Sequence, residues 1–181
     1  DLSRQEVFDY LFERIDSLLT EYDISYIKWD MNRDLNHPGD ANGKPAVHNQ
    51  TRAFYQLLAK LKSAHPRVAI ESCASGGGRA DYGVLAHTDR IWTSDSNDAL
   101  ERLKIQKGFS YFFPAGLMGT HVGPRNCHIT HRNINMAMRA SVTLFGHMGM
   151  EMDLRELTDE EALELKAMVE LYKKHRQLVH S

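Results

Sequence analysis

The stretch that decides the fold is Ile24-Ser-Tyr-Ile-Lys-Trp-Asp-Met-Asn32. Its first half is typical of a buried β-strand, yet it ends in the polar side chains of Lys28, Asp30 and Asn32. Alternation along a strand places Lys28 and Asp30 on the same face. In a parallel barrel, chemistry is carried at the carboxyl ends of the strands. The pattern therefore indicates a cavity lined by a cation and a carboxylate, with a structural Lys–Asp pair at a sheet edge as the alternative.

The composition is that of an ordinary globular domain. The chain has 181 residues, of which 42% are hydrophobic and 25% are charged. A net charge of −2 gives no basic field that would hold nucleic acid or an acidic membrane. The two cysteines, Cys73 and Cys127, form no disulfide framework. The N-terminal residues lack the apolar core of a signal peptide, so we expect a cytoplasmic protein.

Strands and helices are expected to alternate along the whole chain. Apolar periodicity predicts strands at 24–30, 68–73, 90–95, 115–119 and 148–153. It predicts helices at 3–22, 49–64, 81–86, 97–107, 131–145 and from 158 onward, the first begun by a Ser3–Glu6 capping box. Leu100, Leu103 and Ile105 would form the apolar face of the fourth helix. Such alternation predicts a parallel sheet covered by helices.

Polar residues stand at the end of each predicted strand, namely Asp30, Cys73, Asp95, Thr120 and Asp153. That regularity favours a (β/α)8 barrel over an open sheet, in which only the switch point needs polar residues. A complete barrel needs eight strands, and this sequence supplies about five. We therefore interpret residues 1–181 as a partial (β/α)8 barrel, the five C-terminal β/α units, whose first strands lie upstream.

Asp30 and Asp95 are the candidate catalytic pair. Two carboxylates that face one cavity suit glycoside hydrolysis, in which one attacks the sugar and the other donates a proton. Asp98 competes with Asp95, although a charge at the start of a helix is the better interpretation for it.

Other residues allow different chemistry. A strand-end lysine such as Lys28 can form a Schiff base, which would make the protein a lyase. The glycines that follow Ser75 could bring backbone amides close to a ligand. Four potential metal ligands match no standard zinc spacing, so we expect no metal and no other cofactor: His121, Cys127, His128 and His131.

Three segments resemble the α-galactosidases of glycoside hydrolase family 36. They are Tyr26-Ile-Lys-Trp-Asp-Met-Asn-Arg33, Glu71-Ser-Cys-Ala-Ser-Gly-Gly-Gly-Arg-Ala-Asp81 and Ile91-Trp-Thr-Ser-Asp-Ser-Asn-Asp-Ala-Leu-Glu-Arg-Leu-Lys-Ile-Gln106. Their order and spacing match as well. The similarity continues through Tyr111-Phe-Phe-Pro114, Met118-Gly-Thr-His121 and Leu144-Phe-Gly146, so it covers nearly the whole chain.

The resemblance implies a retaining exo-glycosidase with a (β/α)8 catalytic domain. It implies that Asp30 is the nucleophile and Asp95 the acid/base. It further implies substrate-binding roles for five residues, Lys28, Asn32, Cys73, Ser75 and Gly76. The substrate would be a terminal α-galactoside of the raffinose or melibiose type.

The chain departs from the family in extent and in one side chain. Family members carry an N-terminal β-sandwich and a small C-terminal β-domain, and neither is present here. The first barrel strands, which supply further sugar-binding residues, are also missing. Ala80 stands where the family often has an aromatic residue.

Three alternatives to hydrolysis stay open at this point. A galactosyltransferase of the raffinose-synthase kind would share the fold and both carboxylates. A Schiff-base lyase would use Lys28. An isolated partial barrel could also be inactive, because open sheet edges invite association. We expect the parent enzyme to be a homo-oligomer.

Overall fold

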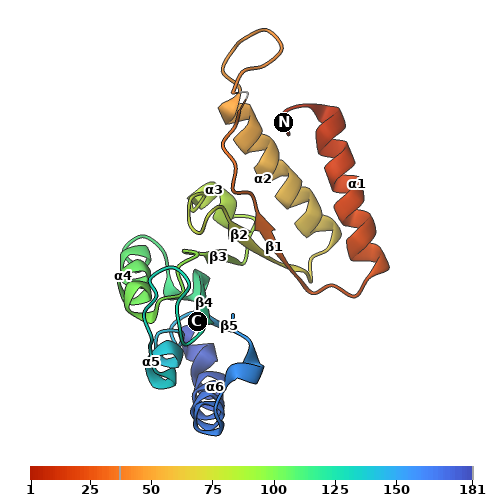
Figure 1. The fold of residues 1–181 in the computed structure, drawn as a ribbon. Helices are drawn as coiled ribbons and strands as arrows, with labels where there is room; N and C mark the ends of the chain where they lie inside the picture. The colour runs from red at the N-terminus through yellow and green to blue at the C-terminus, as the bar shows by residue number, and fades with distance from the viewer. Residues whose placement is uncertain (37, 181) are drawn as a thin grey trace. The chain divides into compact units, whose positions relative to one another are not determined.

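A computed structural model of the protein describes residues 1–36 and 38–180. In chain order its helices and strands are α1 (Gln5–Glu21), β1 (Tyr26–Asp30), α2 (Val47–Ala64), β2 (Ala69–Cys73), α3 (Tyr82–Leu85), β3 (Arg90–Trp92), α4 (Ala99–Ser110), η1 (Ala115–Leu117), β4 (Met118–Val122), α5 (Met136–Ser141), β5 (His147–Met150), η2 (Leu154–Glu156) and α6 (Asp159–Val179). The predicted alternation of five strands with six α-helices is confirmed over the described ranges (Figure 1).

The chain divides into two compact units. The N-terminal unit comprises residues 1–74 and 79–89, and the C-terminal unit comprises 75–78 and 90–181. The first holds α1, β1, α2, β2 and α3, and the second holds the remaining helices and strands.

In the N-terminal unit, β1 and β2 pair in parallel, with Lys28 opposite Glu71 and Asp30 opposite Cys73. Helix α2 buries Leu57, Leu58 and Leu61 almost completely. Figure 1 shows α1 and α2 side by side, and the two helices are in contact. The helix predicted at 49–64 is thus confirmed, and these leucines form part of its buried face.

Strand β1 is less buried than the sequence suggested. Its residues alternate between exposed and half-buried, and Lys28 and Asp30 share the exposed set. Trp29 points to the other side, where its ring lies 5.7 Å from that of Phe54 in α2. One face of β1 is therefore covered by a helix, and the other carries the polar side chains.

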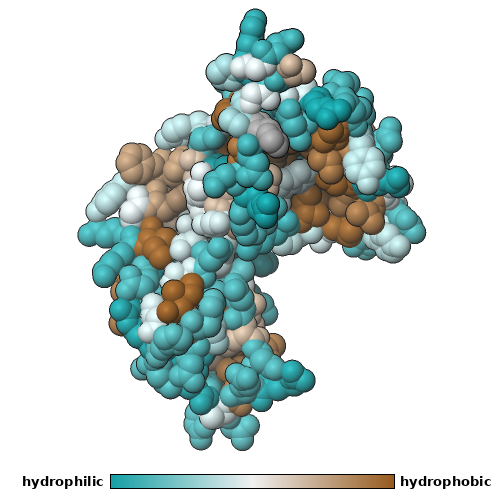
Figure 2. All heavy atoms as spheres, turned by 45° about the horizontal axis from the view of Figure 1, so that its top comes forward, coloured by the Kyte–Doolittle hydropathy of each residue, from teal (hydrophilic) through white to brown (hydrophobic). Residues whose placement is uncertain are grey.

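The expected capping box of α1 is wrong. The helix is preceded by Arg4, which makes no capping hydrogen bond, while the Ser3 hydroxyl donates to Asp1 at 2.7 Å. Glu6 accepts from Arg4 instead. None of the residues in α1 is fully buried, and hydrophobic side chains are visible at the surface of this unit in Figure 2.

In the C-terminal unit, β3, β4 and β5 pair in parallel in sequence order, with Trp92 opposite Gly119 and Thr120 opposite Met148. A hydrophobic cluster joins β4, α5 and α6 and contains Val122, Met136, Ala140 and Leu165. Helix α6 begins behind Thr158 with a complete capping box. That predicted start is confirmed.

The predicted apolar face of α4 is wrong. Leu100 and Leu103 are 44% and 49% exposed, whereas Arg102 and Gln106 are buried. Arg102 donates to the carbonyl oxygens of Ser94 and Gly119, and Gln106 donates to that of Val142. Because buried carbonyl oxygens need donors, the polar face of this helix turns inward.

Several other bounds differ from the expected ones. Strand β3 ends at Trp92, β4 begins at Met118 after a short 3-10 turn, and β5 ends at Met150. Helix α5 is only six residues long, because residues 125–134 bond to one another as a loop before it. Among the described residues, no helix combines the length and the apolar character needed for a transmembrane span.

Candidate active site

The N-terminal unit gathers four of the predicted site residues at the carboxyl ends of β1 and β2. Asp30 ends β1 and Cys73 ends β2 directly opposite it, with Lys28 one pleat earlier. Asn32 donates from its Nδ2 to Oδ2 of Asp30 at 3.1 Å. This bond fixes one carboxylate oxygen of Asp30. The carboxyl group is exposed, so it is accessible to a ligand.

Lys28 has an acidic partner on the neighbouring strand. Its Nζ lies 3.9 Å from Oε1 of Glu71, the residue opposite it in the register. The Glu71 side chain is 1% exposed, whereas that of Lys28 is 35% exposed. A buried carboxylate is stable only when cations or donors are near it. Lys28 therefore neutralises a buried charge while its ammonium group still reaches solvent.

Arg79 is the residue in this unit that the sequence analysis left without a role. Its guanidinium donates to the carbonyl oxygens of Met31 and Cys73, both at 2.9 Å. Burial lowers the pKa of Arg79, and the negative charge of Asp30 acts in the opposite direction. Arg79 thus joins the ends of β1 and β2 and presents a positive charge to Asp30. Arg79 lies within one of the segments that resemble the family, but its hydrogen-bond partners could be identified only from the fold.

The C-terminal unit holds the other three predicted residues, Ser75, Gly76 and Asp95. Gly76 has φ +80°, and a Cβ at this position would lie 2.5 Å from the Cα of Ser94. The amide of Gly77 donates to the carbonyl oxygen of Thr93 at 3.1 Å. The glycines therefore allow this loop to pack backbone against backbone beside the segment that precedes Asp95.

Asp95 is held by an indole. The Nε1 of Trp92 donates to Oδ1 of Asp95 at 3.0 Å, and the aspartate itself is exposed. Trp92 is 1% exposed and thus anchored in the unit's interior. An exposed carboxyl group on a fixed support can exchange a proton with a ligand.

Asp98 is a structural residue, as its position before a helix suggested. It is fully buried, and its Oδ1 accepts from the amides of Leu100 and Glu101 at the start of α4. Burial raises its pKa, but bonds from Thr130, these amides and the nearby charge of Arg132 outweigh that effect, so the pKa is lowered overall. An ionised helix cap of this kind has no free oxygen to offer a substrate.

The four potential metal ligands do not form a metal site among the described residues. Within residues 1–36 and 38–180, no three histidine, cysteine or acidic side chains group closely enough to hold a metal ion. His121 contacts Trp92 and Glu151, and Cys127 is buried as a free thiol.

Comparisons with known proteins agree over the full chain. The family model described as Melibiase matches residues 1–181. An alpha-galactosidase of Escherichia coli is 49% identical over 181 residues, which are 100% of this chain and 25% of that protein. The chain therefore spans about a quarter of the length of the curated relatives it matches.

Solved structures give the same result. The crystal structure of the GH36 alpha-galactosidase AgaA from Geobacillus stearothermophilus matches with a TM-score of 0.94 at 37% identity, over 99% of this chain and 26% of that chain. A variant of AgaA in complex with raffinose matches with the same TM-score and identity, over the same shares of the two chains.

These matches define the class of protein. The five β/α units are a portion of a (β/α)8 barrel, in which functional side chains stand at or after the carboxyl ends of the strands. The chain belongs to the melibiase family. The resemblance to glycoside hydrolase family 36 is thereby confirmed.

Proposed function

We propose that this chain carries the catalytic carboxylates of a retaining α-galactosidase that acts on terminal α-galactosides of the raffinose or melibiose type. The observation that carries the proposal is the position of Asp30 and the groups around it. It is an exposed carboxylate at the end of a barrel strand, oriented by Asn32 and exposed to the charge of Arg79. The chain also shares 49% of its residues with an alpha-galactosidase.

The proposed reaction has two steps. In the first, Asp30 attacks the anomeric carbon, the glycosidic bond breaks, and Asp95 gives its proton to the departing oxygen. In the second, Asp95 takes a proton from water, and that water displaces Asp30 from the galactosyl ester. Two inversions restore the starting α-configuration. The reaction needs no metal or organic cofactor.

Substrate binding is assigned to five polar or small residues of the strand ends. Lys28 and Asn32 present an ammonium and an amide group that can bond sugar hydroxyls. Cys73, Ser75 and Gly76 would border the sugar, and a larger side chain at Gly76 would clash with the backbone of Ser94.

The test uses azide and the full-length protein. Asp30→Ala should lose turnover of raffinose, and azide should restore reaction with a dinitrophenyl α-galactoside to give the β-galactosyl azide. Asp95→Ala should instead give the α-galactosyl azide, because there azide attacks the galactosyl–Asp30 ester. The two products separate the nucleophile from the acid/base.

The control removes a carboxylate outside the proposed site. Asp159→Asn, in the first turn of α6, should retain wild-type turnover. Undiminished activity of Asp30→Ala would refute its role. Release of galactosylated acceptor in place of free galactose by the wild type would favour a transferase of the raffinose-synthase kind.

The remaining parts of the proposal concern the whole protein. We place it in the cytoplasm because a chain with only two cysteines and no disulfide framework fits a reducing compartment. We also propose a homo-oligomer, which light scattering of the full-length protein would reveal.

A further inference from the structure

The hydrogen bond from Trp92 to Asp95 restricts what the aspartate can do. An indole Nε1–H is a donor only and has no lone pair to accept a proton. It lies 3.0 Å from Oδ1, so this oxygen must act as the acceptor. When the carboxyl group is protonated, its proton is therefore on the other oxygen, Oδ2. From there it can be transferred to a ligand.

Two planar side chains hold the indole in place. The guanidinium of Arg102 lies 4.8 Å from the centre of the Trp92 ring. The imidazole of His121 lies 4.2 Å from it, at an interplanar angle of 34°. Arg102 is itself anchored on the carbonyl oxygens of Ser94 and Gly119 at 3.0 and 2.7 Å. Side chains locked by packing position a functional group better than side chains on free loops.

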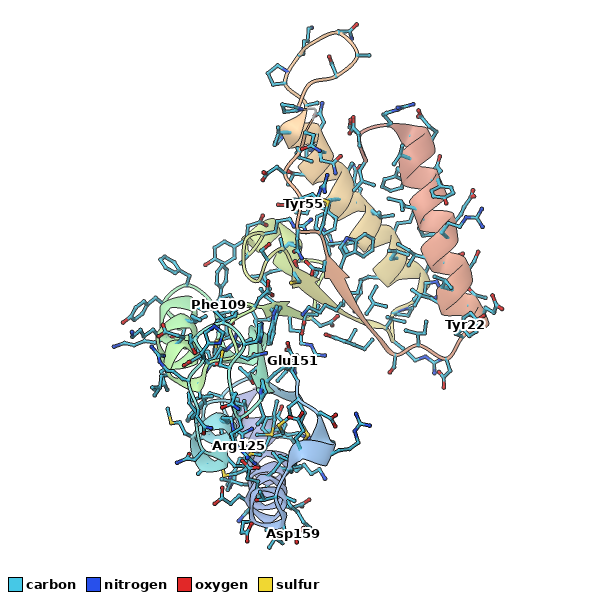
Figure 3. The ribbon with its side chains drawn as sticks, in the orientation of Figure 1. Tyr22, Tyr55, Phe109, Arg125, Glu151 and Asp159 are labelled. Atoms are coloured by element: carbon cyan, nitrogen blue, oxygen red, sulfur yellow. The ribbon has the colours of Figure 1, made fainter. Side chains whose placement is uncertain are left out.

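His121 is fixed in turn by the next strand. Its Nδ1 lies 2.9 Å from Oε2 of Glu151, which directly follows β5 and is labelled in Figure 3. Gly149 leaves room for the imidazole, because a Cβ there would lie 2.6 Å from Cδ2 of His121. A continuous set of contacts thus runs from Glu151 through His121 and Trp92 to Asp95, all within the C-terminal unit.

We propose that Trp92 is a positioning residue that reserves Oδ2 of Asp95 for proton transfer, with His121, Glu151 and Arg102 as its supports. This inference rests on the proposed acid/base role of Asp95. As the glycosidic bond breaks, the Oδ2–H proton moves to the departing oxygen and both electrons of the broken bond stay with that oxygen. The indole N–H stabilises the carboxylate that remains.

The test is Trp92→Phe in the full-length protein, which keeps an aromatic ring but removes the N–H donor. Sugar leaving groups need a proton, whereas dinitrophenolate leaves without one. We therefore expect kcat/KM for melibiose to fall by about tenfold, part of the 10²–10⁴ that acid catalysis supplies. For a dinitrophenyl α-galactoside the fall should stay within about threefold.

Three comparisons complete the experiment. Asp95→Ala removes the proposed acid entirely. The difference between its losses of kcat/KM on the two substrates is therefore the largest that we expect from any of these variants. Trp29→Phe, the other strand tryptophan, should lower both kcat/KM values by the same factor, because Trp29 packs on Phe54. Glu151→Gln should shift the ratio in the same direction as Trp92→Phe but by less.

The outcomes are distinct. A selective loss on melibiose supports the inference. An equal loss on both substrates, or none, would overturn it and leave Trp92 as a packing residue. A wild-type protein that hydrolyses neither substrate would instead refute the proposed function, and Asp95→Ala without substrate selectivity would refute the acid/base role.

Discussion

At the scale of single residues, two arginines bond backbone carbonyl oxygens in the strands or just after them. Arg79 bonds those of Met31 and Cys73 in the N-terminal unit, and Arg102 bonds those of Ser94 and Gly119 in the C-terminal unit. Each arginine brings a positive charge close to the strands while it donates to carbonyl oxygens, of which that of Gly119 is buried. Arginine suits this role because its planar group offers several donors in fixed directions.

The first prediction concerns Arg79. Arg79→Met should leave the part-buried carbonyl oxygen of Cys73 without this donor, at a cost of about 1–3 kcal/mol, whereas the exposed one of Met31 can bond water. It should also lower kcat, because Asp30 loses the nearby positive charge. Arg79→Lys should recover part of kcat but little stability, since lysine lacks the planar arrangement of donors.

The measurement is the thermal midpoint and kcat of the full-length variants. Arg155→Met, which removes an arginine side chain that is 90% exposed, is the matched control and should change neither quantity. Equal kcat values for the Met and Lys variants would show that the charge of Arg79 has no effect on Asp30.

At the scale of elements, helix α6 is tied to α5 and to the loop after β4 by a partly buried ion network. Glu161 accepts from Arg125 and, at 2.6 Å, from Arg139, whose side chain is 2% exposed. Arg125 is labelled in Figure 3. The bond from Arg125 is the largest of the effects that lower the pKa of Glu161, against burial, which raises it.

The second prediction concerns Glu161→Gln. Removing the carboxylate leaves the buried charge of Arg139 uncompensated, which costs about 3–5 kcal/mol. Because the folded pKa of Glu161 lies below its unfolded value, its contribution is fully present above the unfolded pKa and is lost as pH falls through the folded one. Wild type should therefore lose stability in acid more steeply than the variant.

Thermal midpoints of the two full-length proteins between about pH 3 and pH 7 provide the measurement. The two curves should lie furthest apart at neutral pH and approach each other in acid. A constant separation over the whole range would show that Glu161 does not titrate differently in the folded protein.

At the scale of the whole molecule, the chain spans 25% of its E. coli relative, and its described residues hold five of the eight strands a barrel needs. We propose that the first barrel strands, an N-terminal β-sandwich and a C-terminal β-domain belong to the longer protein. In the described residues, no strand pairs with the outer edge of β1 or of β5.

The third prediction concerns residues 1–181 expressed alone. Two open strand edges favour association with other chains. Exposed aromatic side chains add to this tendency, including Tyr111, Phe112 and Phe145 at 70%, 72% and 65% exposed. The isolated segment should therefore self-associate on size exclusion and fail to hydrolyse a nitrophenyl galactoside. A monomer with a sharp thermal transition would contradict this expectation.

Local sequence patterns were enough to predict the order of helices and strands and the carboxylate at the end of β1. These features follow from local periodicity, which acts between residues near one another in the chain. Helix α2 and the Thr158 cap are examples, and the family resemblance extended the same information to Asp30 and Asp95. Predictions of side-chain burial were weaker, as α4 shows.

The contacts between groups that are distant in the sequence could be identified only from the folded chain. Glu71 as the partner of Lys28, Trp92 as the donor to Asp95, and the inward turn of Arg102 all depend on strands that pair across long stretches of sequence. A buried charge or donor is stable only beside its partner, and that partner is identified by three-dimensional proximity. The residues that we propose as catalytic were named from the sequence, whereas the residues that orient them could be identified only from the fold.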